Sequence, residues 1–204
     1  MSKLIGLSGL AGSGKSTIGN ILCENGFKQL SFADSLKNSV SAIFGWDRKL
    51  LEGDTVESRE FRLKIDTFWT NKLGRPITPR YILQYFGTDI CRNNISENIW
   101  LNSLERKLDG DVVITDVRFK NEYDFIHEHG GIIVKVERYI PHWQQLAKDA
   151  ELGDVDALKL LEEQGIHRSE WDLINCTPDY IIENTSTLEN LKKETEKFIK
   201  LIEE

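Results

Sequence analysis

The sequence contains few cysteines and no long apolar run. Its three cysteines are an odd number at wide spacing, which argues against a disulfide scaffold and against a zinc cluster: Cys23, Cys91 and Cys176. The longest apolar stretches, such as Val112–Ile114 and Ile132–Val134, are far shorter than the ~20 residues that cross a bilayer. No signal peptide is visible, because a glycine-rich segment follows the first few residues. We therefore expect a cytoplasmic protein without a membrane partner.

Repeats, low-complexity tracts and basic stripes with interleaved aromatic residues are also missing, so the sequence does not predict nucleic-acid binding. The chain has 204 residues, a length typical of one domain, and its 26 basic and 33 acidic residues give a net charge of −7. Residues 1–100 carry 13 basic and 10 acidic side chains, whereas residues 101–204 carry 13 and 23. This distribution suits small anionic ligands in one cleft better than a long polyanion.

Five short apolar runs are predicted strands, and most lie next to a helical pattern: Leu4–Leu7, Gln29–Phe32, Val112–Thr115, Ile132–Val136 and Tyr180–Ile182. Because the runs are continuous rather than alternating, they favour strands that are buried on both faces of a parallel sheet. A last helix is predicted to begin with a capping box of Ser186 and Glu189. The sequence thus predicts an α/β protein.

The strongest local motif follows the first predicted strand. It satisfies the G-x-x-x-x-G-K-[ST] pattern with Gly9, Leu10, Ala11, Gly12, Ser13, Gly14, Lys15, Ser16 and Thr17. Glycines let several backbone N–H groups converge on a polyphosphate, and the following helix presents its N-terminus to the anion. We expect Lys15 to reach the β- and γ-phosphates of ATP, Ser16 to ligate Mg²⁺ and Thr17 to contact the α-phosphate. The alternative is a glycine-rich turn with an incidental lysine.

A metal-binding acid is predicted at the end of the third strand. Asp116 follows the apolar run at the carboxyl end of a predicted parallel strand, where ligands bind in open α/β sheets. We therefore expect Asp116 to hold the water shell of the metal. The alternative is an Asp that caps the next helix, although Asn121 and Glu122 could also serve that turn.

Missing motifs narrow the class of P-loop protein. Asn71–Gly74 lacks the Asp of a guanine-reading Asn-Lys-x-Asp motif, Asp116–Phe119 lacks the glycine of a GTPase switch, and no ABC-type signature is present. Small phosphotransferases remain, whose second substrate is recognised by arginines and lysines from helical insertions. Two long, mostly helical segments, one between the second and third strands and one between the fourth and fifth, fit that class.

Several segments resemble the deoxynucleoside monophosphate kinases encoded by bacteriophages: Phe32–Lys37, Arg80–Trp100, Ile114–Glu122, His167–Glu170 and Asp179–Asn184. The resemblance covers most of the chain outside Asp47–Gly74 and Pro141–Gln164. It implies a P-loop NTPase fold with five parallel strands in the order 2-3-1-4-5, helices on both faces, a helical NMP-binding insertion and a lid. It also implies that the γ-phosphoryl group of ATP passes to a dNMP, and it suggests a homodimer.

The family's organisation is one kinase domain over residues 1–204. The core would comprise residues 1–31, 111–137 and 179–204, the NMP-binding insertion residues 32–110, and the lid residues 138–178.

The resemblance implies roles for individual residues. Beside the P-loop residues, Arg138 and Arg168 look like the pair that closes over the transferring phosphoryl group, and Asn184 and Thr185 fall where the fold packs the adenine of ATP. The implied catalytic residues are Lys15, Arg118, Arg138 and Arg168. The implied acceptor residues are Lys37, Arg80 and Arg118 for the 5′-phosphate, Gln84 for the base, Asp34 for orienting the acceptor or assisting the metal, and Asp89.

Each acceptor residue has a structural alternative. Arg80 could pair with an acid at a helix start, Lys37 could be solvated on an exposed helix face, and Gln84 could be an ordinary helix residue. Arg118 could form an ion pair with its neighbour Asp116. For the whole chain, two other functions stay open. One is phosphoryl transfer to another small phosphate ester, because phosphomevalonate kinases carry a similar Phe-Ala-Asp-x-Leu-Lys segment, and the other is a non-catalytic P-loop nucleotide-binding module.

Overall fold

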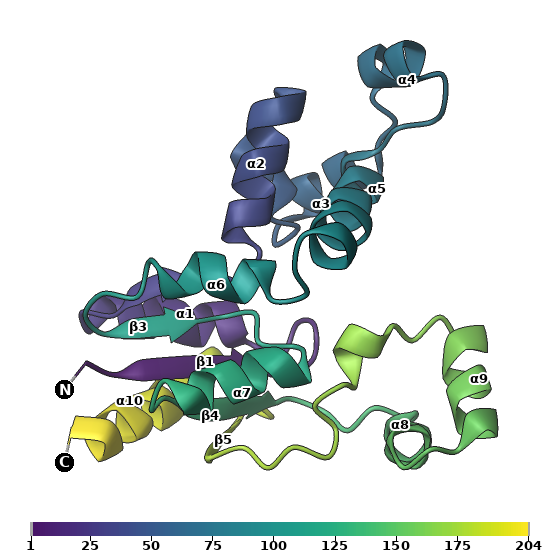
Figure 1. Cartoon of the computed structure of the whole chain (residues 1–204). Coiled ribbons are helices and arrows are strands. Elements are labelled where there is room, and N and C mark those ends of the chain that lie inside the picture. The colour runs from purple at the N-terminus through teal and green to yellow at the C-terminus, as the bar shows by residue number, and fades with distance from the viewer. Residues whose placement is uncertain (1, 204) are drawn as a thin grey trace. The chain divides into compact units, whose positions relative to one another are not determined.

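The structure is a computed structural model, and it describes residues 2–203. Its contacts divide the chain into two compact units (Figure 1): unit 1 comprises Met1–Ser31 and Leu108–Glu204, and unit 2 comprises Phe32–Lys107. Within the described residues, every helix is too short or too polar to cross a membrane.

Unit 1 is built on a parallel sheet whose strand order among the described residues, β2-β3-β1-β4-β5, confirms the expected order (Figure 1). The strands are β1 (Leu4–Ser8), β2 (Lys28–Leu30), β3 (Val112–Ile114), β4 (Ile132–Glu137) and β5 (Tyr180–Glu183). All residues of β1 and β3 are buried, whereas the edge strands β2 and β5 are partly exposed. The continuous apolar runs of the central strands thus reflect burial on both faces.

Helices cover both faces of the sheet. Helices α1 (Lys15–Glu24) and α10 (Leu188–Glu203) contact each other and enclose a core that includes Ile5, Leu7, Ile18, Leu22, Val113 and Phe198. Helix α7 (Lys120–Glu128) contacts β1 and β4. Gly6, which alternates with Ile5 and Leu7, lies on that second face: a Cβ there would be 2.8 Å from Ile133 Cδ1 and 3.1 Å from Ile126 Cγ1.

Each predicted strand differs from the observed strand by one or two residues at an end, and the cap predicted for the last helix is also wrong by one residue. The second strand ends at Leu30 and does not reach Phe32, because Leu30 pairs with Ile114, the last residue of its partner strand β3. Helix α10 is capped by Thr187, whose Oγ1 accepts a hydrogen bond from the Asn190 backbone N–H at 3.2 Å. A serine and a threonine in succession offer two caps of similar strength, and local pattern alone does not choose between them.

The segment between β4 and β5 contains α8 (Gln144–Glu151), α9 (Val155–Glu163) and the 3₁₀ helix η3 (Arg168–Glu170). Helices α8 and α9 pack on each other around a small core of Trp143, Ala147, Leu161 and Trp171. The P-loop residue Leu10 packs against that core. The segment is therefore held to the rest of unit 1 beside the glycine-rich loop.

Asp179 ties the segment before β5 to the rest of unit 1. Its Oδ2 accepts the Ile133 backbone N–H at 2.7 Å and lies 2.8 Å from His127 Nε2. Burial raises the pKa of Asp179, but these hydrogen bonds and the charge of His127 outweigh it and hold the pKa below its usual value. The carboxylate therefore stabilises the fold above the unfolded-state pKa, and this contribution is lost as pH falls through the lower folded-state pKa.

We predict that Asp179→Asn lowers the free energy of unfolding at pH 7 by roughly 0.5–1 kcal/mol, at the low end of hydrogen-bond values because the carboxylate is partly exposed. The measurement is urea unfolding of both proteins from pH 7 to pH 3. The difference between them should shrink as the pH falls below about 4. A difference that stays constant over this range would show that the charge of Asp179 does not matter.

Unit 2 is helical in the residues that the structure describes. Its elements are α2 (Asp34–Phe44), the 3₁₀ helix η1 (Arg48–Leu51), α3 (Val56–Leu63), α4 (Thr67–Leu73), α5 (Pro79–Gln84), the π-helical η2 (Tyr85–Arg92) and α6 (Ile99–Glu105). They enclose a core that includes Val40, Trp46, Leu51, Ile77, Ile82 and Leu83. Thr78 caps α5 by accepting the Tyr81 backbone N–H at 3.1 Å, with Pro79 at the first helical position.

The segment Leu83–Asp89 passes from α5 into the π-helical η2. Gly87 packs so closely on α2 that a Cβ there would lie 2.8 Å from Leu36 Cδ2. Its carbonyl accepts the indole N–H of Trp100 at 3.1 Å. Irregular helical turns of this kind are frequent at functional sites, because they redirect the side chains that follow.

Candidate active site

The glycine-rich loop connects β1 to α1 and adopts a conformation that only glycine accepts easily. Gly9, Gly12 and Gly14 have φ angles of 134°, 74° and 111°. A Cβ on Gly9 would lie 2.5 Å from the Val136 carbonyl oxygen, and one on Gly14 would lie 2.7 Å from Asn184 Nδ2. Two of the three glycines are thus required by close packing as well as by the backbone.

Lys15 is the first residue of α1, and its side chain is buried against the loop. Its Nζ donates to the carbonyl oxygens of Gly9 at 2.6 Å and Leu10 at 2.9 Å. Burial and the charge of Arg118 lower the pKa of Lys15 to about 8, against opposing contributions from Glu170 and Asp116. A cation held in this way is poised for an anion, because phosphate oxygens would compensate the charge that burial disfavours.

Two side chains from distant parts of unit 1 hold the loop. Asn184, which follows β5, donates its Nδ2 to the Ser13 carbonyl at 2.8 Å, and Arg138, which follows β4, donates its Nη1 to the Gly12 carbonyl at 3.0 Å. Thr185 is exposed next to Asn184. The Ser13 Oγ is buried and has no hydrogen-bond partner among the described residues. An unpaired polar atom inside a loop of this kind indicates a site built for a polar ligand.

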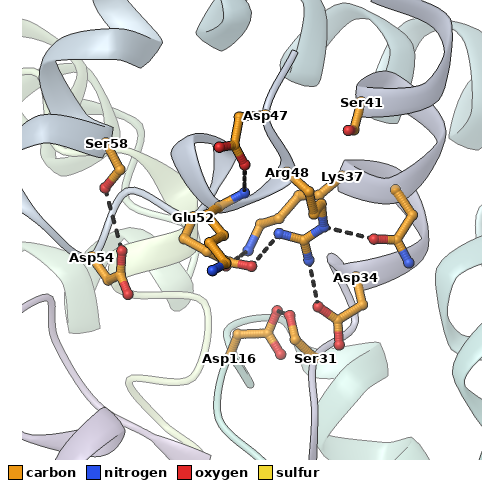
Figure 2. Close-up of polar contacts among 12 residues, drawn as sticks. Ser31, Asp34, Lys37, Ser41, Asp47, Arg48, Glu52, Asp54, Ser58 and Asp116 are labelled. Atoms are coloured by element: carbon orange, nitrogen blue, oxygen red, sulfur yellow. Dashed lines mark hydrogen bonds and ion pairs between the residues drawn. The ribbon is translucent and has the colours of Figure 1, made fainter. Parts of the chain in front are cut away.

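Asp116 lies two residues beyond β3, and Ser31 Oγ donates to its Oδ2 at 2.6 Å (Figure 2). Its charge acts on Lys15, so it belongs to the same part of unit 1. Helix α7 is capped by another acid: the buried Glu122 accepts the backbone N–H groups of Arg118 and Phe119 at 2.8 and 3.1 Å. Glu122, and not Asp116, therefore accepts the backbone N–H groups at the start of α7.

The donors at this edge fit Mg²⁺. Ser16 is exposed at the start of α1 and offers a hydroxyl oxygen, and Asp116 offers a carboxylate. Oxygen ligands of this type, completed by waters and phosphate oxygens, are what Mg²⁺ prefers in proteins. No cluster of three or more His, Cys, Asp or Glu side chains that could hold a metal occurs in residues 2–203.

Arg118 and Arg168 are both ion-paired within unit 1. Arg118 Nη1 donates to Glu170 Oε1 at 3.0 Å. Arg168 Nη2 donates to Glu151 Oε2 at 2.7 Å, its Nε pairs with Asp172, and its guanidinium lies 4.2 Å from the ring centroid of Trp171.

A cavity of about 80 Å³ in unit 1 is bounded by the loop, the end of β4 and the segment after α9. Its lining includes Gly9, Ser13, Arg118, Arg138 and Glu170. The structure thus brings the loop together with two of the arginines that the sequence singled out.

The acceptor residues expected from the sequence belong to unit 2, apart from Arg118. Lys37 is not a solvated surface residue: its side chain is 15% exposed and its Nζ lies 2.6 Å from Glu52 Oε2. Asp34 pairs with Arg48 at 2.8 Å. Arg80, Gln84 and Asp89 are exposed. Arg80 has no acidic partner among the described residues, so it does not form the helix-start pair that was its structural alternative.

Three charged residues contact expected site residues but were not predicted from the sequence. Glu170 contacts Arg118 and lies in the quoted His-Arg-Ser-Glu segment, so the motif itself was the available signal. Arg48 and Glu52 contact Asp34 and Lys37, but they lie in a segment where no resemblance was found. Their spacing of four residues was the only local indication of a pair.

Comparison with known proteins adds to this geometry. The sequence profile of the deoxynucleotide monophosphate kinase family matches residues 49–195. A protein of Acanthamoeba polyphaga mimivirus, provisionally named a deoxynucleotide monophosphate kinase, is 37% identical over 151 residues, which cover 66% of this chain and 74% of the relative.

Two further relatives are more distant. The deoxynucleoside-5′-monophosphate kinase of Escherichia phage T5 is 30% identical over 182 residues, covering 63% of this chain and 73% of the relative. A dephospho-CoA kinase of Fusobacterium nucleatum is 27% identical over 98% of both chains. The family profile covers more than two thirds of the chain and the two viral relatives carry the same family name, so the chain belongs to the deoxynucleotide monophosphate kinase family, as an ATP-dependent kinase of nucleoside monophosphates.

Proposed function

We propose that the P-loop edge of unit 1 binds ATP with Mg²⁺, and that unit 2 supplies the main contacts to the deoxynucleoside monophosphate. The observation that carries the donor assignment is the buried Lys15, held against the loop carbonyls beside Arg118, Asp116 and Glu170. The assignment also covers the loop residues Gly9, Ala11, Gly12, Ser13, Gly14, Ser16 and Thr17, with Asn184 and Thr185 toward the adenine. Residues 138–178 would be the lid and residues 32–110 the NMP-binding insertion.

The arginines would neutralise the charge that gathers when two phosphorylated molecules react. Lys15, Arg118, Arg138 and Arg168 would surround the transferring phosphoryl group with donors that bind its oxygens. Arg168 would have to exchange its contacts with Glu151 and Asp172 for phosphate. Because the attacking oxygen of the acceptor is already anionic, no strong general base is needed.

Ser16 and Asp116 would hold Mg²⁺, which bridges phosphate oxygens and offsets their charge. The hydroxyl of Ser16 suits direct ligation, and the carboxylate of Asp116, kept in place by Ser31, suits an acceptor for metal-bound water.

On the acceptor side, Lys37, Arg80 and Arg118 would bind the 5′-phosphate. Lys37 and Arg80 are contributed by α2 and α5. Gln84, on the last turn of α5, would hydrogen-bond the base, and Asp34 and Asp89 would orient the acceptor. Exposed Arg80 and Gln84 retain the hydrogen-bonding capacity that such contacts require.

Arg80→Ala tests this division between donor and acceptor residues. We expect the KM for dNMP to rise roughly tenfold to a hundredfold, because a hydrogen bond to a charged group is lost, while the KM for ATP stays nearly unchanged. Steady-state kinetics with a coupled assay of ADP release provide both constants. Arg106→Ala, which removes an exposed arginine of the same unit, is the matched control.

If ATP binding weakened instead, the division of the two substrates would be wrong. The same assay with dephospho-CoA as acceptor checks specificity, because a relative carries the name of a kinase for that substrate. ADP release should require a dNMP, and faster release with dephospho-CoA would contradict the acceptor assignment.

A further inference from the structure

Four charged side chains of unit 2 form a continuous chain of ion pairs (Figure 2). Lys37 Nζ donates to Glu52 Oε2 at 2.6 Å, and Arg48 Nη1 donates to the other oxygen of the same carboxylate. Arg48 also donates its Nη2 to Asp34 Oδ1 at 2.8 Å and its Nε to Asn38 Oδ1 at 2.6 Å. All three nitrogens of Arg48 are thus engaged, and Glu52 joins the two cations.

The scaffold around this chain is well packed. Leu51, between Arg48 and Glu52, is fully buried in the core of unit 2. Asp47 caps η1 by accepting the Lys49 backbone N–H at 2.9 Å, and the Ser41 hydroxyl donates to the Trp46 carbonyl at 2.6 Å.

The ion pairs themselves are also partly shielded from water. The side chains of Lys37, Arg48 and Glu52 are 15%, 26% and 35% exposed. A half-buried pair on a packed scaffold differs from a loose surface ion pair, whose charges are screened by solvent and whose side chains must first be ordered.

The ionisation of Glu52 is favoured in this setting. Burial raises its pKa, but hydrogen bonds and charges from Lys37 and Arg48 outweigh burial and hold the pKa below its usual value. Lys37 donates one of its three N–H groups to Glu52, and Arg48 donates three of its five to its neighbours. Lys37 therefore keeps two N–H groups, and Arg48 keeps one on Nη1 and one on Nη2, so both cations can still donate hydrogen bonds to phosphate oxygens.

We propose that Arg48 binds the 5′-phosphate of the acceptor together with Lys37, and that Glu52 is a positioning residue that holds the two cations side by side. This inference rests on the proposed role of Lys37 in acceptor binding. It adds Arg48 to the proposed phosphate site as a second cation. It also gives Glu52 a function beyond balancing the charge of the two cations.

Two physical effects of Glu52 on acceptor binding oppose each other. The direction in which the KM for dNMP changes when Glu52 is replaced therefore shows which effect is larger. By its charge alone, Glu52 repels a phosphate dianion, and removing that charge would tighten acceptor binding. By ordering two long side chains before the substrate arrives, Glu52 reduces the entropy that binding must otherwise lose. We expect positioning to dominate, because Lys37 and Arg48 lie against Glu52 and their positive charges offset the repulsion between its carboxylate and the phosphate.

Glu52→Gln is the first test. Glutamine keeps one carbonyl acceptor and places an amide donor where the second oxygen stood, so it can hold only one of the two cations. We expect the KM for dNMP to rise about tenfold and the KM for ATP to stay unchanged. Glu60→Gln, which removes the same charge from an exposed position on α3, should change neither constant.

Arg48→Met tests the second cation directly. The KM for dNMP should rise at least about tenfold, whereas Lys49→Met, at the exposed neighbouring position of η1, should leave it unchanged. In a protein that carries both Lys37→Met and Arg48→Met, adding Glu52→Gln should have little further effect on this KM, because Glu52 acts only through these cations. A merely structural role would leave the effect of Glu52→Gln intact in that background.

The outcomes separate the possible failures. A KM for dNMP that falls or stays constant in Glu52→Gln overturns the positioning role. If Lys37→Met raises this KM but Arg48→Met does not, the inference fails and the proposed acceptor site stands. If Lys37→Met has no effect, the proposed acceptor site itself is wrong. Thermal unfolding checks that each variant folds, and should Glu52→Gln fail to fold, Arg48→Lys must raise the same KM for the proposal to stand.

Discussion

Replacing Lys15 by alanine is expected to abolish phosphoryl transfer and to leave the chain folded. The Lys15 Nζ is the cation that the loop holds beside the proposed phosphate site, and alanine removes it without filling the space. Loss of one charge-assisted contact to the transition state should cost at least ~1.4 kcal/mol, which lowers kcat/KM to less than about a tenth.

Fold stability should not fall with activity in this variant. Burial disfavours the charged form of Lys15, so the alanine variant no longer has the desolvation cost of a buried ammonium group. This gain offsets the loss of the two hydrogen bonds that Lys15 makes. Thermal unfolding and kcat/KM should be measured on the same preparation, with Lys192→Ala on the exposed side of α10 as the control. More than about a tenth of the activity retained by Lys15→Ala would contradict the phosphate role.

Among replacements of loop glycines by alanine, Gly9→Ala is expected to lower the free energy of unfolding the most. An L-residue at φ 134° is strained, and the new Cβ would lie 2.5 Å from the Val136 carbonyl oxygen. The strain alone costs on the order of 1–3 kcal/mol, and the clash adds to it because a backbone atom in the middle of the sheet cannot move aside. We expect the free energy of unfolding to fall by at least about 3 kcal/mol, as measured by urea unfolding.

Gly12→Ala is the matched comparison. Gly12 has φ 74°, but no atom lies within 4 Å of a Cβ built there. The cost should therefore be only the left-handed backbone penalty, about 1–2 kcal/mol. Equal losses in the two variants would show that the contact of Gly9 with β4 does not constrain the loop.

Much of unit 1 was predictable because its signals are local. A buried parallel strand needs a continuous apolar run, and β1 and β3 have one. The P-loop needs glycines at positions of positive φ, and three of them stand in the motif. The boundary errors at Leu30 and Thr187 arose where the deciding contact is a partner strand or one of two adjacent caps.

The charged residues of unit 2 were less predictable. The basic residue types pointed to phosphate, and the resemblance selected Lys37 and Arg80. No periodicity reveals, however, that Arg48 and Glu52 meet α2, because that contact depends on the packing of Leu51 in a nonlocal core. An Arg and a Glu four residues apart are usually an ordinary surface pair.

The sequence by itself determined the class of the fold, the phosphate-binding loop and the kind of chemistry, because strand burial, glycine conformation and phosphate affinity are properties of residues and their immediate neighbours. Only the tertiary structure decided which acids accompany the cations: Glu170 beside Arg118, and Glu52 beside Lys37. The reason is that ion pairs join side chains from separate elements, and the packing of the apolar core sets which elements meet.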